Sequence, residues 1–255
     1  MNRTLQFAKR NLIELSRDVL GYIFCIAFPI VMLIVMSVVN QSIPKEANML
    51  IFRIDYLSGG IIVFGQTFVM LFTAILVATD KSTSFLVRLF SSPMKSSDFT
   101  NGYILPMIFI GMIQAIVTMI ASSVIAGITG VSLNPAGQLL VILTSIPSAI
   151  MFLSIGLIFG TLFNEKSAPG VCSVIISVGT FLGGVFFDAE GTGGPIFKVC
   201  KCLPFLYCTK VARSTIQMDF QWDNFGKPLV IVSATALALV LLAIFLFRAR
   251  MKADH

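Results

Sequence analysis

The chain has 255 residues, of which 56% are hydrophobic and 12% are charged, whereas an average soluble domain is about 45–50% hydrophobic and about 25% charged. Together with a mean hydropathy of +0.93, this composition excludes a soluble enzyme, a nucleic-acid-binding domain and a disordered scaffold, because too few charged residues remain to cover a water-exposed surface. The net charge of +6 is typical of a membrane protein whose basic loops face anionic lipid in the cytoplasm.

Residues 1–18 are predicted to form an amphipathic helix that lies in the membrane interface. One helical stripe is apolar and consists of Leu5, Ala8, Leu12, Leu15 and Val19. Arg3, Arg10 and Arg17 repeat every seven residues, a spacing that would let them reach lipid phosphates. The same pattern also fits a helical extension of the first membrane span.

Six apolar stretches without Asp, Glu, Lys, Arg or His are long enough to cross a bilayer, which takes about 20 residues in a helix. They are residues 19–39, 57–79, 103–127, 138–163, 168–187 and 229–247. The sequence therefore predicts an all-α polytopic membrane protein with six transmembrane helices in a single domain, residues 1–255. If both termini are inside, the inner segments hold 11 of the 18 Lys and Arg residues, so the positive-inside rule places both termini in the cytoplasm of a cell-membrane protein.

A few polar side chains lie within these spans. Gln66, Met70 and Thr73 share one face of the second span, and Gln114 lies in the third. Because polar side chains avoid lipid, these four residues line either a translocation path or hydrogen-bonded contacts between helices.

The inner loop at 80–102 contains a second amphipathic segment. Phe85, Leu86, Leu89 and Phe90 form an apolar face, and Pro93 ends the helix. An exposed apolar face on the inner side is typical of a docking element. The alternative is a helix that lies against the ends of the protein's own spans.

Gly183 and Gly184 are predicted to break the fifth span near its outer end. The outer loop at 188–228 then contains two apolar-faced segments separated by Pro204. We expect them to form outer re-entrant helices, and an irregular basic loop is the alternative. Cys202 and Cys208 lie in this loop, and the sequence leaves open whether they form a disulfide.

Motifs for enzymatic chemistry are missing. The sequence contains no G-x-x-x-x-G-K-[ST] motif, and its single histidine is the last residue, His255. We therefore expect no catalytic residue, no metal site and no ATP hydrolysis by this chain. The lack of ionisable residues in the spans also argues against a proton-driven carrier.

Several segments resemble the ABC-2 type transporter permeases. The family's cytoplasmic segment, roughly R-E-x-G-T-L-x-R-L-L-x-S-P, is matched by Leu86, Arg88, Leu89, Phe90, Ser92 and Pro93, whereas Ser82, Ser84 and Phe85 depart from it. The stretch 156–187 is similar to the family's fifth-span signature. Leu203-Pro204-Phe205 followed by Val211-Ala-Arg213 is similar to its L-P…E-A-x-R ending, with Val211 in place of Glu.

The resemblance implies the pore-forming subunit of an ATP-driven exporter. Two permease subunits would pair, as a homodimer or a heterodimer, with two separate ATPase subunits that bind ATP and Mg. Residues 81–92 would form the coupling helix, and its ATPase contacts would come from Phe85, Leu86, Arg88, Leu89, Phe90 and Pro93. Because the spans carry no charge, an apolar or amphipathic cargo is expected, such as a drug, a peptide antibiotic or a lipid. The alternatives are an ion-coupled secondary transporter or channel, and a membrane scaffold that transports nothing.

Overall fold

The structure is a computed structural model that describes residues 3–44, 50–83 and 96–253. The described residues are helical apart from turns and short connections, as the sequence predicts. In chain order the α-helices are α1 (Arg3–Leu15), α2 (Val19–Tyr22), α3 (Phe28–Ser42), α4 (Ile54–Ser82), α6 (Ser96–Thr129), α7 (Pro135–Thr144), α8 (Ile146–Leu162), α9 (Ala168–Leu182), α10 (Ala189–Thr192), α11 (Gly194–Cys202), α12 (Pro204–Ile216) and α13 (Lys227–Ala253). The π-helical segments Ile23–Ala27 and Trp222–Gly226 lead into α3 and α13, and the short helix Leu50–Phe52 precedes α4.

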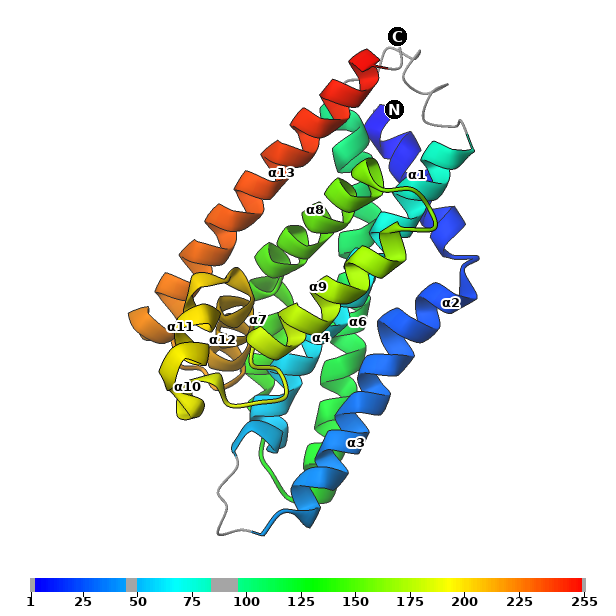
Figure 1. Ribbon diagram of the computed structural model, residues 1–255. Helices are drawn as coiled ribbons and strands as arrows, with labels where there is room; N and C mark the ends of the chain where they lie inside the picture. The colour runs from blue at the N-terminus through cyan, green and yellow to red at the C-terminus, as the bar shows by residue number, and fades with distance from the viewer. Residues whose placement is uncertain (1–2, 45–49, 84–95, 254–255) are drawn as a thin grey trace.

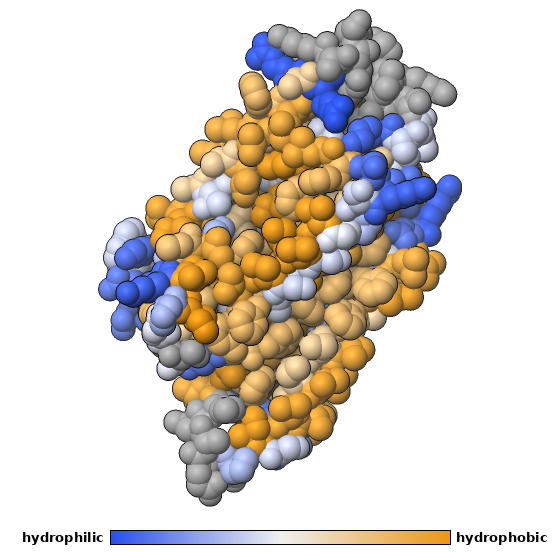
Figure 2. Space-filling view, viewed as in Figure 1, coloured by the Kyte–Doolittle hydropathy of each residue, from blue (hydrophilic) through white to orange (hydrophobic). Residues whose placement is uncertain are grey.

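The long helices run alongside one another in a bundle (Figure 1). The helix α1, the C-terminal end of α4 and the C-terminal end of α13 lie at one end of the bundle, and the connection from α6 to α7 lies at the other. Figure 2 shows an apolar belt over the middle of the bundle, with hydrophilic side chains at the end that holds α1 and beside α11. This distribution is that of an integral membrane protein.

Among the residues that the structure describes, five helical segments are long and apolar enough to cross a membrane: Val19–Ser42, Ile54–Ser82, Ser96–Thr129, Pro135–Leu162 and Trp222–Arg250. They correspond to the predicted first, second, third, fourth and sixth spans. The stretch predicted as the fifth span, residues 168–187, contains only the 15-residue helix α9. At about 1.5 Å per residue, α9 is about 22 Å long, which is less than the roughly 30 Å of a bilayer core.

The short length of α9 follows from the break that comes after it. The helix ends directly before Gly183, and Gly184 has a φ of +65°, a value that glycine adopts without strain. The carbonyls exposed by the break are paired by α12: the Thr209 hydroxyl donates to the Gly183 oxygen at 2.5 Å, and Arg213 donates to the oxygens of Gly184 at 2.8 Å and Val185 at 3.3 Å. Without such partners, a helix break in an apolar bundle would leave costly unpaired groups.

The helix α4 forms the centre of the bundle, and 89% of its most apolar 18-residue stretch is buried. Glycines on α8 allow the two helix backbones to meet. A Cβ atom at Gly156 would lie 2.4 Å from the Met70 oxygen, and one at Gly160 would lie 2.7 Å from the Ala74 oxygen. Both distances are shorter than real side chains allow, so the Gly156-x3-Gly160 pattern determines how closely α8 packs on α4.

The helix α1 is separate from the first span. The chain turns at residues 16–18, and the Asp18 carboxylate caps α2 by accepting a hydrogen bond from the Gly21 N–H at 3.1 Å. A continuous extension of the first span, one of the two sequence-based alternatives, is therefore wrong. The reason is local, because an N-cap residue has non-helical backbone angles and starts a new helix.

The buried face of α1 also differs from the predicted stripe. It consists of Phe7, Ala8, Asn11 and Leu15, whereas Leu5 and Val19 are exposed. Phe7 determines this rotation, because its ring fills the gap above a glycine of α6: a Cβ atom at Gly102 would lie 2.3 Å from the ring. The helix therefore packs on α6 through a side chain that lies outside the apolar stripe.

Candidate functional site

An apolar cleft of about 440 Å³ opens between α3, α4 and α9. Its lining consists of six phenylalanines and three smaller residues: Phe28, Phe64, Phe68, Ile176, Ser177, Thr180, Phe181, Phe186 and Phe187. The helix α3 provides Phe28, α4 provides Phe64 and Phe68, and α9 with the turn after it provides the other six residues. The break at Gly183 and Gly184 matters for the lining, because it turns the chain so that two further phenylalanines join the cleft.

The phenylalanine rings of the cleft contact one another. The Phe64 ring centroid lies 5.9 Å from Phe28, 5.1 Å from Phe68 and 5.4 Å from Phe186. Phe64 and Phe68 are four residues apart, so they lie on the same face of α4. Edge-on and tilted ring contacts at these distances leave a continuous aromatic surface for an apolar ligand.

Polar groups are few in this cleft. The Ser177 hydroxyl is satisfied within α9, where it donates to the Ser173 carbonyl at 2.9 Å. The Thr180 hydroxyl is buried and has no hydrogen-bond partner among the described residues. Because no charged side chain lines the cleft, the arrangement suits binding and passage of an apolar group with a polar substituent, and it offers no acid, base or nucleophile.

The four residues that the sequence marks as a candidate translocation path do not line this cleft. Gln66, Met70, Thr73 and Gln114 are all at most 2% exposed. Gln66 is two residues from both Phe64 and Phe68, about half a helical turn, so it faces away from the cleft. Met70 and Thr73 contact α8 at Gly156.

Both glutamines form hydrogen bonds inside the bundle, Gln66 to another helix and Gln114 within α6. The Gln66 amide donates to the Ser145 carbonyl at 3.1 Å and accepts from the Ser148 hydroxyl at 2.7 Å, which ties α4 to the junction of α7 and α8. The Gln114 amide donates to Thr118 at 3.1 Å, and its side-chain oxygen has no partner among the described residues. In this conformation Gln66 holds helices together, the second of the two roles that the sequence leaves open.

An ion pair with a buried carboxylate joins α1 to the C-terminal end of α4. The Arg10 guanidinium donates to both oxygens of Asp80, at 2.8 and 2.9 Å, and the Tyr103 hydroxyl of α6 donates to the same carboxylate at 2.7 Å. The Asp80 side chain is 3% exposed and that of Arg10 is 36% exposed. Bidentate pairing of a buried carboxylate with arginine is among the stronger polar contacts in proteins.

The surroundings of Arg10 correct the prediction that its side chain reaches lipid phosphates. Partial burial lowers the Arg10 pKa, but the hydrogen bond and charge of Asp80 and the charge of Glu14 outweigh this effect and leave the pKa raised. Arg3 begins α1, and Arg17 is exposed in the turn after it. The seven-residue spacing therefore does not place Arg10 and Arg17 in equivalent surroundings, because α1 ends at Leu15.

Further contacts hold the C-terminal end of α4 from its other side. The Lys81 ammonium donates to the carbonyls of Thr161 at 3.0 Å and Phe163 at 2.6 Å, where α8 ends. The Ser82 hydroxyl donates to Glu165 at 3.0 Å. The predicted ATPase contacts, Phe85, Leu86, Arg88, Leu89, Phe90 and Pro93, lie outside the described residues.

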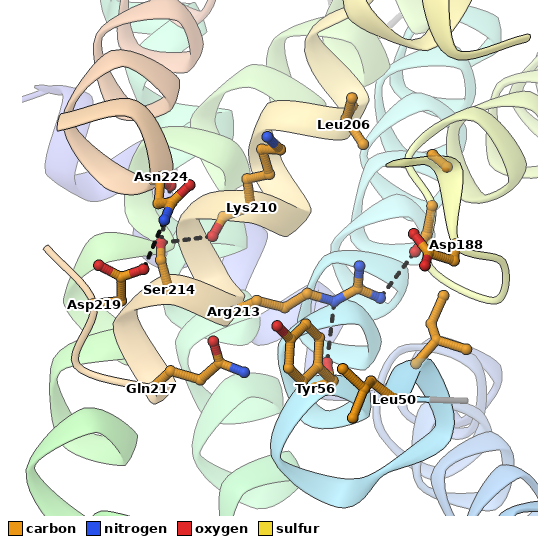
Figure 3. Close-up of a pocket in the computed structure, with 13 residues that line it drawn as sticks. Leu50, Tyr56, Asp188, Leu206, Lys210, Arg213, Ser214, Gln217, Asp219 and Asn224 are labelled. Atoms are coloured by element: carbon orange, nitrogen blue, oxygen red, sulfur yellow. Dashed lines mark hydrogen bonds between the residues drawn. The ribbon is translucent and has the colours of Figure 1, made fainter. Parts of the chain in front are cut away.

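At the other end of α4, a polar pocket of about 310 Å³ lies beside α12 (Figure 3). Arg213 extends from α12 across this pocket and donates from Nε to the Tyr56 carbonyl at 3.1 Å. Asp219 accepts a hydrogen bond from the Asn224 amide at 2.7 Å on the opposite wall. A Cβ atom at Gly59 would lie 2.9 Å from the Arg213 nitrogen, so glycine is needed for α12 to approach α4 at this point.

The two helices expected in the 188–228 loop are α11 and α12, which meet at Leu203 and Pro204. All five cysteines are free thiols, so Cys202 and Cys208 are not bridged. Cys202 is exposed. Cys208 lies on α12 and is buried, and burial raises the pKa of its thiol.

The family model described as ABC-2 type transporter matches residues 3–217, from the start of α1 to the end of α12. The chain belongs to the ABC-2 type transporter family. Permeases of this family are membrane-spanning subunits that associate with an ABC ATPase and are not ATPases themselves. No curated protein matches the chain. The matched region contains every residue of the aromatic cleft and of the Arg10–Asp80–Tyr103 contact.

Two features of this ABC-2 permease do not follow from its sequence. The first is the burial of Asp80 between Arg10 and Tyr103. The hydropathy pattern places Asp80 at the start of a loop, whereas the structure places it in the last turn of α4. The aromatic cleft has a local signal in Phe64 and Phe68, which share a helix face. Nothing in the sequence indicates that this face meets Phe28 and Phe186, because that contact depends on the packing of α3 and α9.

Proposed function

We propose that this ABC-2 permease is the pore-forming subunit of an ATP-driven exporter in the cell membrane, with both termini in the cytoplasm. The observation that carries the proposal is the aromatic cleft on a chain of this family. The cleft is lined by α3, α4, α9 and the turn after α9, and none of the described residues that line it is charged. A surface of this kind can guide an apolar cargo, whereas it contributes nothing to chemical catalysis.

The cargo that fits this cleft is apolar or amphipathic, such as a drug, a peptide antibiotic or a lipid. Moving a charged group into the cleft would remove its water without providing an opposite charge, which is costly. The unpaired Thr180 hydroxyl can form one hydrogen bond to a neutral polar group of the cargo. An ion-coupled carrier is less well supported, because the cleft holds no ionisable side chain.

A second permease subunit, either a copy of this chain or a related one, would close the open side of the cleft. The exposed face of α9 supports this arrangement, because Val174, Val178 and Phe181 are 59%, 38% and 58% exposed on it. Two ATPase subunits would hold ATP and Mg and would contact residues 81–92. Closure of the ATPases would shift the equilibrium between inward-open and outward-open pairs of subunits.

Ligand-stimulated ATP hydrolysis tests this proposal. The permease is assembled with its ATPase in lipid nanodiscs, and hydrolysis is measured with Nile red as a neutral apolar probe, with a fluorescent phospholipid, and with fluorescein as an anionic probe. We expect stimulation by at least one of the first two and none by fluorescein. Phe186→Ala should raise the probe concentration needed for half-maximal stimulation by about tenfold. Burial of a Phe side chain against a bound apolar probe is worth about 1.5–3 kcal/mol, and about 1.4 kcal/mol is a factor of ten in affinity.

Phe245→Ala is the matched control, because Phe245 is 65% exposed on α13 and lies outside the cleft. It should leave stimulation unchanged. Three results would contradict the proposal: ATP hydrolysis by the permease without an ATPase, equal stimulation by the anionic probe, or equal effects of the two Phe substitutions.

A further inference from the structure

The helices on either side of residues 84–95, α4 and α6, are both tied to α1. The helix α4 ends at Ser82 and α6 begins at Ser96, so these two helix ends flank the stretch. Asp80 lies two residues before the end of α4, and Tyr103 lies seven residues after the start of α6. Arg10 of α1 and Tyr103 both donate to the Asp80 carboxylate, so one carboxylate joins three helices.

Further contacts join two of these helices, α1 and α6. The Asn11 amide of α1 donates to the Gly102 carbonyl at 3.1 Å and is fully buried, and the Thr4 hydroxyl donates to Asp98 at 3.0 Å. The Phe7 ring lies edge-on to Phe99 at 5.9 Å and to Tyr103 at 4.9 Å. We call this set of residues (Thr4, Phe7, Arg10, Asn11, Asp80, Asp98, Phe99, Gly102 and Tyr103) the inner clamp.

Asp80 is the only member of the inner clamp from α4, so within the clamp it alone ties α4 to α1. Its side chain is 3% exposed and accepts three hydrogen bonds, which leaves it little freedom to move alone. A buried carboxylate that loses its cationic partner becomes strongly unfavourable, so the ion pair resists separation of the helices. A displacement of the α4 end must therefore move α1 as well, provided that the pair stays intact.

We propose that Asp80 is a positioning residue that makes α1 move together with the α4 and α6 ends when the ATPase closes. This role rests on the proposed function, because it requires an ATPase that acts on residues 81–92. From α1 the displacement passes through the short turn at 16–18 into α2 and α3, and α3 forms one wall of the aromatic cleft. The clamp thereby links the ATPase contact to the α3 wall of the aromatic cleft.

Hydrogen–deuterium exchange of the assembled permease–ATPase complex in nanodiscs tests this role, with and without ATP and with an ATPase variant that binds ATP but does not hydrolyse it. In the wild-type complex, ATP should change exchange in α1 and at the ends of α4 and α6 together. In Asp80→Asn, which keeps the shape of the side chain and an acceptor for Tyr103, the ATP response of α1 should be lost. Asp80→Glu should restore it, because the carboxylate is regained.

The matched control is Asp55→Asn. Asp55 also pairs with an arginine and lies on the same helix, but at the opposite end, and Arg53 in that pair is 49% exposed. This variant should keep the wild-type ATP response. Thermal melting of each permease is recorded beside the exchange, because a purely structural role would lower the melting temperature of Asp80→Asn without changing the ATP response of the molecules that remain folded.

The outcomes separate the two proposals. An ATP response of α1 that persists in Asp80→Asn, or a wild-type α1 that does not respond while α4 and α6 do, overturns the role of Asp80. A wild-type permease that binds no ATPase overturns the proposed function itself, and the role of Asp80 with it. Loss of the α1 response in Asp80→Asn, with the ATPase still bound and the response restored by Asp80→Glu, supports the role.

Discussion

Replacing Arg213 by alanine should destabilise the bundle at the N-terminal end of α4. Its guanidinium donates to the carbonyls of Tyr56, Gly184 and Val185. The Tyr56 carbonyl lies in the first turn of α4 and keeps its own helical hydrogen bond. The carbonyls of Gly184 and Val185 follow the end of α9, so both lose a partner that no helix replaces.

The size of the effect follows from these groups. A buried carbonyl left without a partner costs about 1–3 kcal/mol, so the two oxygens together cost about 2–6 kcal/mol. Hydrogen bonds within membrane bundles average about 0.6 kcal/mol each, which puts the three bonds of Arg213 near 2 kcal/mol as a lower figure. We expect a loss of about 2–5 kcal/mol, which corresponds to about 5–15 °C in melting temperature for a chain of this size.

Thermal melting in detergent measures the overall loss, and a native thiol reports where it occurs. Cys208 precedes Arg213 on α12 and is buried with a raised pKa, so maleimide should not modify it in the wild type. In Arg213→Ala we expect Cys208 to become reactive, while Cys202 is exposed and reacts in both proteins. Arg213→Lys should fall between the two, because a lysine replaces the planar donor group with a single point charge.

Arg53→Ala is the control, because Arg53 is half-exposed in its pair with Asp55, and such surface pairs contribute about 0–1 kcal/mol. Suppose instead that Arg213→Ala melts within about 2 °C of the wild type, a shift below the ~2–4 °C expected per kcal/mol, and that Cys208 stays protected. The carbonyls at the break of α9 would then be satisfied without Arg213, and pairing by this side chain would not be what stabilises the break.

Two further predictions concern the packing of α8 and the ATPase contact. Gly156→Ala should destabilise the permease by about 1–3 kcal/mol, because its Cβ atom would lie 2.4 Å from the Met70 oxygen. Gly127→Ala, whose Cβ atom meets nothing within 4 Å, should be neutral or slightly stabilising in thermal melting. Equal melting of both variants would contradict the close approach of α8 to α4. Leu89→Asp should weaken co-purification of the ATPase by at least about tenfold, since burial of a leucine is worth about 1.5–3 kcal/mol. Lys95→Ala should have little effect on it, and unfolding of the Leu89→Asp permease alone would mean that this segment packs on its own spans.

The C-terminal end of α4 shows where reasoning from the sequence stops. The apolar run that ends at Thr79 predicts the second span correctly, because hydropathy is a local property of the chain. The helix continues to Ser82, and Asp80 becomes a buried group only because Arg10 and Tyr103 reach it. These partners lie 70 and 23 residues away in the sequence, so no local pattern could assign them.

The sequence by itself determined that this protein lies in a membrane, where five of its long apolar helices occur, and that its chain breaks at Gly183 and Gly184. Only the tertiary structure decided which faces of those helices meet protein and which meet lipid. The physical reason is that lipid and a packed interior are both apolar. Both α4 and the segment Trp222–Arg250 are strongly apolar, yet 89% of the most apolar 18-residue stretch of α4 is buried and only 17% of that of the segment. Hydrophobic periodicity cannot separate these two surroundings, so the aromatic cleft and the partners of Gln66 became known only when the helices were packed together.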